Sequence, residues 1–203
     1  MIAFWLAALF VGLVATPARR VLADRRPWVA AGVTLVVVLP NVFWQAMHGF
    51  PFLELGGYAV AHKNPPLSLM AFMWGEAKDL NAGALPIWLA GLSAFAFSRG
   101  FSGLRCFAIG YAVLIAAMIV LHGKTYYPAG SYPILFAAGS VVIERSATRH
   151  AVATSAVVFG AIGLPFGLPI QTFIAYQRYV QPGPLPRLYA DMFGWPEMVA
   201  LVR

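Results

Sequence analysis

The chain has 203 residues, of which 61% are hydrophobic and only 10% charged, and its mean hydropathy is +0.75. A soluble domain carries about 25% charged residues, so this composition excludes a water-soluble globular fold and indicates a polytopic membrane protein. The formal net charge of +7 would suggest nucleic acid as a partner in a soluble protein. Here the arginines lie in short segments between apolar runs, which indicates membrane topology and no nucleic-acid partner.

Six apolar runs predict membrane-spanning helices, because a span needs roughly 20 mostly apolar residues. The runs are 2–16, 28–47, 82–98, 105–121, 129–143 and 151–173. Pro165 and Pro169 should kink the last run or end it early. We therefore expect an all-α fold, a polytopic transmembrane bundle of about six spans over residues 1–173. An outer loop and an interfacial helix are expected at 48–81, and an outer-side tail at 174–203.

The distribution of charge predicts the orientation of the bundle. With the N-terminus outside, the inner segments carry eight arginines against two carboxylates, a net +6. The outer segments carry six basic against five acidic residues, a net +1, and the two sides together give the total of +7. The positive-inside rule prefers this assignment. All three lysines then lie on the outer side, and we expect any reaction or ligand binding to take place there.

A set of polar and aromatic residues follows Pro40 at the end of the second run. Asn41, Trp44, Gln45 and His48 recur at spacings of three, four and seven, so they share one helical face. Polar groups on one face of a membrane helix usually turn inward, which favours the wall of a polar cavity. The alternative is that Trp44 anchors the helix at the interface while Asn41 and Gln45 bond to neighbouring helices.

The segment that follows offers hydrogen-bond donors and one carboxylate. His62 and Lys63 precede Asn64-Pro65-Pro66, where two prolines stop any helix. They are candidates to bind an anionic head group, or they belong to an ordinary hydrated loop. Glu54 is the one outer carboxylate that follows a span closely with a histidine nearby. It is a weak candidate for a general base, since a glutamate in a loop is more often solvated.

Residues 67–80 are amphipathic but too short and polar to span. Apolar residues fill the first part of this segment, and three charged residues stand near its end, Glu76, Lys78 and Asp79. This pattern predicts a helix that lies on the membrane, either at the rim of an entrance for a lipid substrate or as a simple anchor.

The strongest candidate site is the polar island at 122–133, His-Gly-Lys-Thr-Tyr-Tyr-Pro-Ala-Gly-Ser-Tyr-Pro, between two apolar runs. Lysine is costly in hydrocarbon and must lie at the interface or in a hydrated cavity. Lys124 can offer three donors to a phosphate, and Tyr126 and Tyr127 can each add a hydroxyl. The alternative is an aromatic belt at a helix end, where tyrosine and lysine are common. The spacing of Cys and His predicts no metal site.

Three motifs in one order suggest a family. Pro40-Asn-Val-Phe-Trp-Gln-Ala-Met-His-Gly-Phe-Pro51, His62-Lys-Asn64 and Gly123-Lys-Thr-Tyr-Tyr with Tyr132-Pro133 resemble bacterial glycosyltransferase family 39. That family is related to the protein O-mannosyltransferases and to the aminoarabinose transferase of lipid A. The resemblance covers almost the whole chain. It implies a partial GT-C fold in the bacterial inner membrane, with the active side facing out.

The same resemblance implies a reaction. Such enzymes move a sugar from a polyprenyl-phosphate donor to an acceptor, and Lys124 matches the lysine that lies near the carrier phosphate. The family's catalytic acidic residue lies in a first outer loop that has no counterpart here. We therefore expect the chain to be an inactive fragment whose partners are membrane lipids, the lipid-linked sugar and a missing N-terminal half. The competing hypothesis is a small non-enzymatic membrane protein, such as a permease subunit or a lipid-binding scaffold.

The orientation can be tested by cysteine labelling from outside intact cells. We expect a Lys124→Cys variant to react with a membrane-impermeant reagent and an Arg19→Cys variant to be protected, because the arginine-rich segments stay inside. Reaction at position 19 together with protection at position 124 would reverse the assignment.

Overall fold

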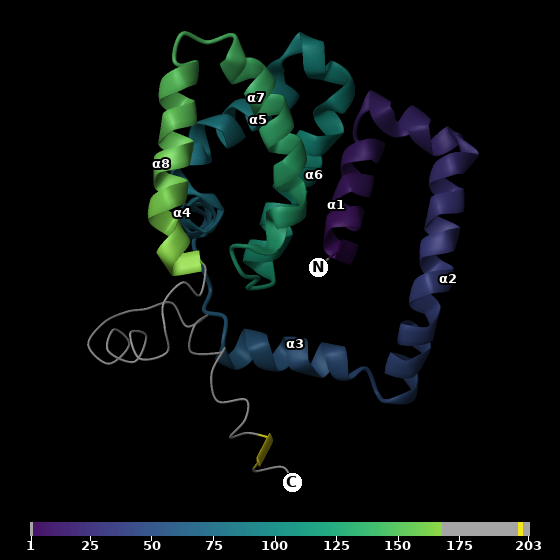
Figure 1. The fold of residues 1–203 in the computed structure, drawn as a ribbon. Helices are drawn as coiled ribbons and strands as arrows, with labels where there is room; N and C mark the ends of the chain where they lie inside the picture. The colour runs from purple at the N-terminus through teal and green to yellow at the C-terminus, as the bar shows by residue number, and fades with distance from the viewer. Residues whose placement is uncertain (1, 168–198, 201–203) are drawn as a thin grey trace.

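The computed structural model describes residues 2–167 and 199–200, and these form helices joined by short turns, with no strand among them (Figure 1). The predicted tail at 174–203 and the end of the sixth predicted span lie outside the described residues. The α-helices are α1 (Ile2–Val14), α2 (Arg25–Met47), α3 (Pro51–His62), α4 (Leu69–Leu80), α5 (Leu85–Phe97), α6 (Arg105–Val120), α7 (Tyr132–Glu144) and α8 (Arg149–Gly167). The 3₁₀ helices are η1 (Pro17–Ala23), η2 (Ala82–Ala84), η3 (Arg99–Leu104) and η4 (Tyr127–Ser131).

Local sequence signals set several helix boundaries. Asp24 caps α2 by accepting a hydrogen bond from the Arg26 amide, and Ser68 caps α4 by accepting one from the Ala71 amide. The turn between α2 and α3 passes through Gly49 and Phe50, whose φ angles are 74° and 58°. These two successive left-handed residues turn the chain from α2 into the crosswise helix α3 (Figure 1).

Two pairs of helices form the centre of the bundle, α5 with α7 and α1 with α6. Each pair meets backbone to backbone at glycines. A Cβ added to Gly91 would overlap the Leu135 carbonyl oxygen, and one added to Gly139 would overlap that of Ile87. Each added atom would also lie 3.0 Å from the amide nitrogen of the other glycine. Small residues that let helices approach closely are typical of packing in membranes, where lipid competes with hydrophobic contacts.

Close contact between backbones at glycines also joins α1 to α6. A Cβ on Gly12 would overlap the Cys106 carbonyl oxygen, and one on Gly110 would lie 3.1 Å from the Ala8 carbonyl oxygen. Cys106 is itself buried at 3% exposure and free of any disulfide. The hydrophobic core then fills the space between α4, α5, α6 and α7. Its largest fully buried apolar side chains are Trp88, Phe72, Phe95, Met118 and Leu135.

Two of the helical segments are long and apolar enough to cross a membrane alone, Arg25–Met47 and Arg99–Val120. Two bent pairs satisfy the same criterion together, Ile2–Val14 with Pro17–Ala23 and Leu69–Leu80 with Ala82–Phe97, at angles of 111° and 103°. The part of the chain that the structure describes therefore has two to four candidate spans by length and composition. The prediction of an all-helical fold is confirmed for the described residues, and these candidate spans support the prediction of a membrane protein.

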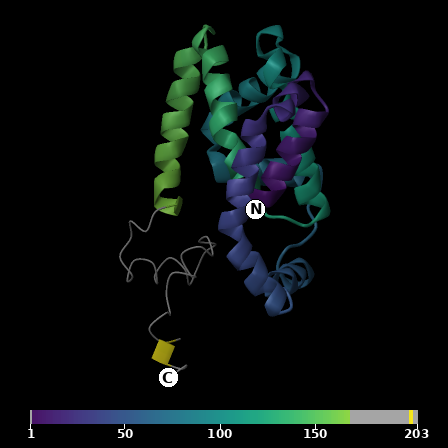
Figure 2. The same ribbon diagram turned by 90° about the vertical axis from the view of Figure 1, so that its right-hand side faces the viewer.

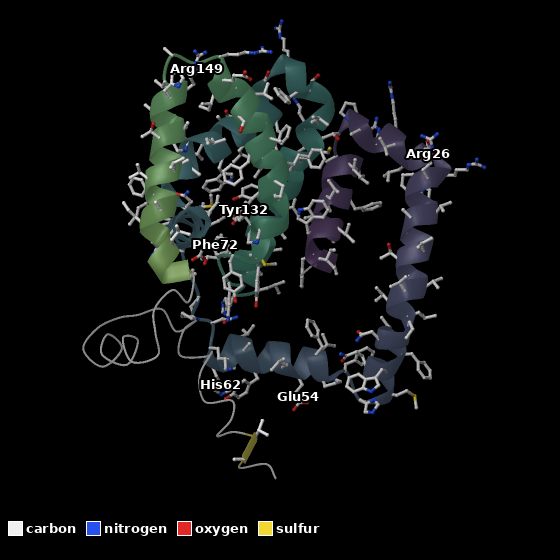
Figure 3. The ribbon with its side chains drawn as sticks, in the orientation of Figure 1. Arg26, Glu54, His62, Phe72, Tyr132 and Arg149 are labelled. Carbon is white, nitrogen blue, oxygen red and sulfur yellow. The ribbon has the colours of Figure 1, made fainter. Side chains whose placement is uncertain are left out.

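The two ends of the bundle differ in chemistry. Arg26 and Arg149 lie at the upper end in Figure 3, and Glu54 and His62 lie at the lower end. The segments η1 and η3, which both carry arginine, contact each other at the upper end. We call the upper one the arginine end and the lower one the lysine end, where Lys63 and Lys124 border one hollow. The arginine-carrying segments η1 and η3 and the hollow bordered by Lys63 and Lys124 thus lie at different ends of the bundle.

Helices α2 and α3 stand apart from the rest in Figure 1, and in Figure 2, where α2 is seen in front of the bundle, α3 lies below it. No residue of α2 or α3 is buried, and α2 makes its main contact with η1. Residues 51–62 were expected within an outer loop and instead form α3. Pro51 at the first helical position, where its missing N–H costs nothing, starts this helix.

Helix α4 forms where the amphipathic pattern predicted it, but its buried face differs from the expected one. Phe72, Glu76 and Ala77 are buried, whereas Met70 and Trp74 are 80% and 59% exposed. Glu76 was expected at the water with Lys78 and Asp79. It lies one helical turn after Phe72, on the same face, and both are fully enclosed by the bundle.

Substitution of a contact glycine tests this packing. A Gly139→Leu side chain would meet the α5 backbone, which cannot give way as a side chain can, so we expect a loss of at least about 1–3 kcal/mol in unfolding free energy. Thermal unfolding in detergent measures it. The matched control is Gly32→Leu, since Gly32 is also inside a helix but has no atom near its added Cβ. Equal loss of stability in the two variants would refute the role of close backbone packing.

Candidate functional site

A hollow of about 610 Å³ opens at the lysine end, between α3 and residues 118–127. Its walls are mostly apolar, from side chains such as Phe4, Phe52, Leu53 and Leu121. The residues with polar groups that line it are Tyr58, Lys63, Asn64, His122, Lys124 and Tyr127. An apolar chamber with two ammonium groups at its border is suited to a molecule that combines a hydrocarbon part with an anion.

His122 determines how the chain leaves α6 and reaches this hollow. Its φ is 50°, in the left-handed region. The His122 amide donates to the Ile119 carbonyl at 3.3 Å and the Gly123 amide donates to the Met118 carbonyl at 2.6 Å. This is the Schellman pattern, in which glycine usually holds the left-handed position. Histidine is among the few other residues found there.

The polar segment, residues 122–131, is then fixed from two sides. Thr125 donates a hydrogen bond from its hydroxyl to Asp79 of α4, and a Cβ on Gly75 would overlap the Thr125 methyl group. From the other side, the Trp5 indole N–H donates to the Ser131 hydroxyl at 2.9 Å. The backbone of residues 122–131 is therefore held against α4 and α1 while Lys124 stays exposed.

The structure brings some of the predicted phosphate-binding residues together. The Lys124 ammonium lies 5.7 Å from the centre of the Tyr126 ring, a cation–π distance. Tyr126 and Tyr127 meet edge to face at 5.1 Å. Lys124 and Tyr127 line the hollow, whereas Tyr126 lies half-exposed outside its lining.

Of the candidate residues in and directly after α3, one lines the hollow and two do not. Lys63 lines the same hollow as Lys124. His62 does not: its ring stacks on Tyr58 at 4.4 Å and its Nδ1 lies 3.1 Å from the Tyr58 carbonyl oxygen. Glu54, the candidate base, is exposed in the first turn of α3 and also lies outside the lining. The hollow thus gathers cations and excludes the carboxylate.

None of the four residues predicted as a cavity wall lines this hollow. Trp44 and His48 stack at 4.3 Å on one face of α2, and Trp44 is half-exposed. The Gln45 side-chain oxygen accepts a hydrogen bond from the Phe52 amide at 3.2 Å. Gln45 thus braces the turn into α3, and Asn41 lies exposed one turn earlier.

Sequence reasoning missed a second polar group deep in the bundle. The Tyr132 hydroxyl donates to the Glu76 carboxyl at 2.7 Å, and Trp88 and Tyr111 meet edge to face beside them. A signal did exist: Glu76 lies four residues after Phe72 and four before Leu80, so it shares their helical face. Reading that face as the core-facing side would have placed Glu76 inside.

The chain has no match among family models, curated proteins or solved structures. The resemblance to family 39 consequently stays a hypothesis carried by its motifs. Function must be inferred from the geometry of the hollow and of the polar segment that borders it.

The left-handed residue can be tested directly. His122→Val places a β-branched side chain where φ is positive, and we expect it to destabilise the protein by roughly 1–2 kcal/mol. His122→Asn should keep the stability, since asparagine tolerates this conformation. Leu121→Val is the control, because Leu121 has a φ of −91°. A His122→Val variant that melts like Leu121→Val would contradict the backbone constraint.

Proposed function

We propose that this chain binds the phosphate of a polyprenyl-phosphate sugar at its lysine end and serves in the transfer of that sugar to an acceptor. The observation that carries the proposal is the pairing of two lysines with an apolar hollow of about 610 Å³. A lipid carrier has the same two parts, a hydrocarbon chain and an anionic phosphate.

The position of Lys124 supports a role at the phosphate. A lysine at the membrane interface can neutralise a lipid phosphate and stabilise it as a leaving group. Lys63 adds a second ammonium group to the lining, and the Tyr127 hydroxyl, or that of Tyr126 at the border, offers a hydrogen bond. The hydrogen bonds from Thr125 to Asp79 and from Trp5 to Ser131 hold the polar segment, and with it the backbone of Lys124, before a ligand arrives.

The finer architecture belongs to the same proposal. α1, α2, α5, α6, α7 and α8 correspond to the six predicted spans, and we propose that they form part of a GT-C bundle. The excess of arginine at one end orients that end to the cytoplasm of a bacterial inner membrane. The hollow then faces outward.

One observation favours a second function, a lipid-phosphate-binding scaffold without catalysis of its own. Among the described residues, no carboxylate lines the hollow, and Glu54 lies outside it. Sugar transfer to an acceptor hydroxyl calls for a general base within hydrogen-bond reach. A scaffold needs only the cations and the apolar walls.

Binding of an undecaprenyl-phosphate sugar to the purified chain in detergent tests the shared step. We expect Lys124→Ala to weaken binding roughly 10- to 150-fold, because a charge-assisted hydrogen bond contributes about 1.5–3 kcal/mol. Lys124→Arg should not restore it, since guanidinium is larger and planar.

The control is Lys78→Ala, which removes an exposed lysine that does not line the hollow. Equal binding by the two alanine variants would show that Lys124 only anchors a helix end, and the phosphate assignment would fall. Turnover of the carrier in the same preparation tests whether the chain catalyses by itself: release of sugar would show a transferase, whereas binding without turnover fits both the scaffold and an inactive part of a transferase.

A further inference from the structure

The interior of the bundle contains an ionisable group that the proposed site does not use. Glu76 of α4 is fully buried, and it is surrounded by Trp88 of α5, Tyr111 of α6 and Tyr132 of α7 at 1%, 4% and 7% exposure. An ionisable side chain enclosed in a membrane bundle is expensive to keep and points to a function.

The hydrogen bonds of this cluster are incomplete. The Tyr132 hydroxyl donates to Oε1 of Glu76 at 2.7 Å. Three further polar atoms are buried without a partner, Oε2 of Glu76, the Tyr111 hydroxyl and the Trp88 indole nitrogen. A neutral carboxylic acid carries a hydrogen on its second oxygen and can donate it, whereas a carboxylate can only accept.

The groups around Glu76 also favour the protonated form of its carboxyl group. The titratable groups that face it are Asp79 of its own helix, Tyr111 and Tyr132, and none of these is a cation. Neither α5 nor residues 151–164 of α8 contain a titratable side chain. Among the described residues the one ion pair is Arg26–Asp24, remote from this cluster. A carboxylate here would be shielded from bulk water and would face no cation among the described residues.

We propose that Glu76, with Tyr132, Tyr111 and Trp88, forms a buried proton-binding site whose occupancy holds α4 inside the bundle. The ligand is one proton, exchanged with water: the carboxylic acid loses it to give a carboxylate, and no other bond changes. Ionisation leaves an uncompensated charge in the core, which is relieved when Glu76 moves to water and α4 loosens.

Helix α4 connects this site to the lysine end. Asp79, one turn beyond Glu76, accepts the hydrogen bond of Thr125, and Gly75 packs against the Thr125 methyl group. Tyr132 directly follows η4 at the other end of the polar segment. Loosening of α4 therefore releases the backbone that carries Lys124. The proton site itself is inferred independently of the function proposed for Lys124.

Infrared spectroscopy of the purified protein tests the protonation state. At neutral pH we expect the carbonyl band of a protonated carboxylic acid, sensitive to exchange into D₂O, in the wild type. The band should vanish in Glu76→Gln and persist in Glu54→Gln, which alters an exposed carboxylate. Tyr132→Phe should shift its frequency, because it removes the donor to the same carboxyl, and this variant serves if Glu76→Gln does not fold.

Thermal unfolding gives a second readout. Above about pH 5 the unfolded chain has released this proton while the folded protein keeps it, so stability should fall as pH rises. Glu76→Gln should lessen that fall between about pH 5 and pH 8, and Glu54→Gln should not. Absence of the band in the wild type, its survival in Glu76→Gln, or equal pH dependence in both variants would overturn the proposal.

Discussion

Helices α5 and α7 approach each other so closely that their backbones touch, and the buried core packs around this pair. Gly91 and Gly139 bring the two backbones together with no space for a methyl group, and this contact orients Trp88 and Tyr132 toward the same interior. In a membrane, apolar side chains gain little by leaving lipid, so tight van der Waals contact between backbones must supply the association. The core around α4 is built on this pair.

Helix α4 links that core to the candidate site. Its bend of 103° relative to the segment of α5 inserts Phe72 and Glu76 between the helices and leaves Asp79 at the border, where it meets Thr125. The polar segment then has a fixed backbone and an exposed cation, Lys124. Rigid support beneath an exposed functional side chain is what pre-organised binding requires.

Much of this arrangement follows from the sequence, but not all of it. Runs of apolar residues predicted the helices at 28–47 and 105–121 closely, because length and hydropathy are local properties. The burial of Glu76 and the left-handed turn at His122 depend on neighbours distant in the chain, which no local pattern specifies. The hollow also depends on contacts between distant segments. The sequence indicated Lys63 and Lys124 separately as candidates, but only the path of α3 brings both to one hollow.

The packing of α1 on α6 makes the single cysteine of the chain a natural reporter. Cys106 is 3% exposed, and Gly12 lies directly against its carbonyl, so its thiol is shielded while the two helices stay together. A thiolate must be reached before it can be alkylated. With a slow reagent, the rate of alkylation at this position therefore reports the fraction of time in which α1 and α6 lie apart, and it does so without any engineered label.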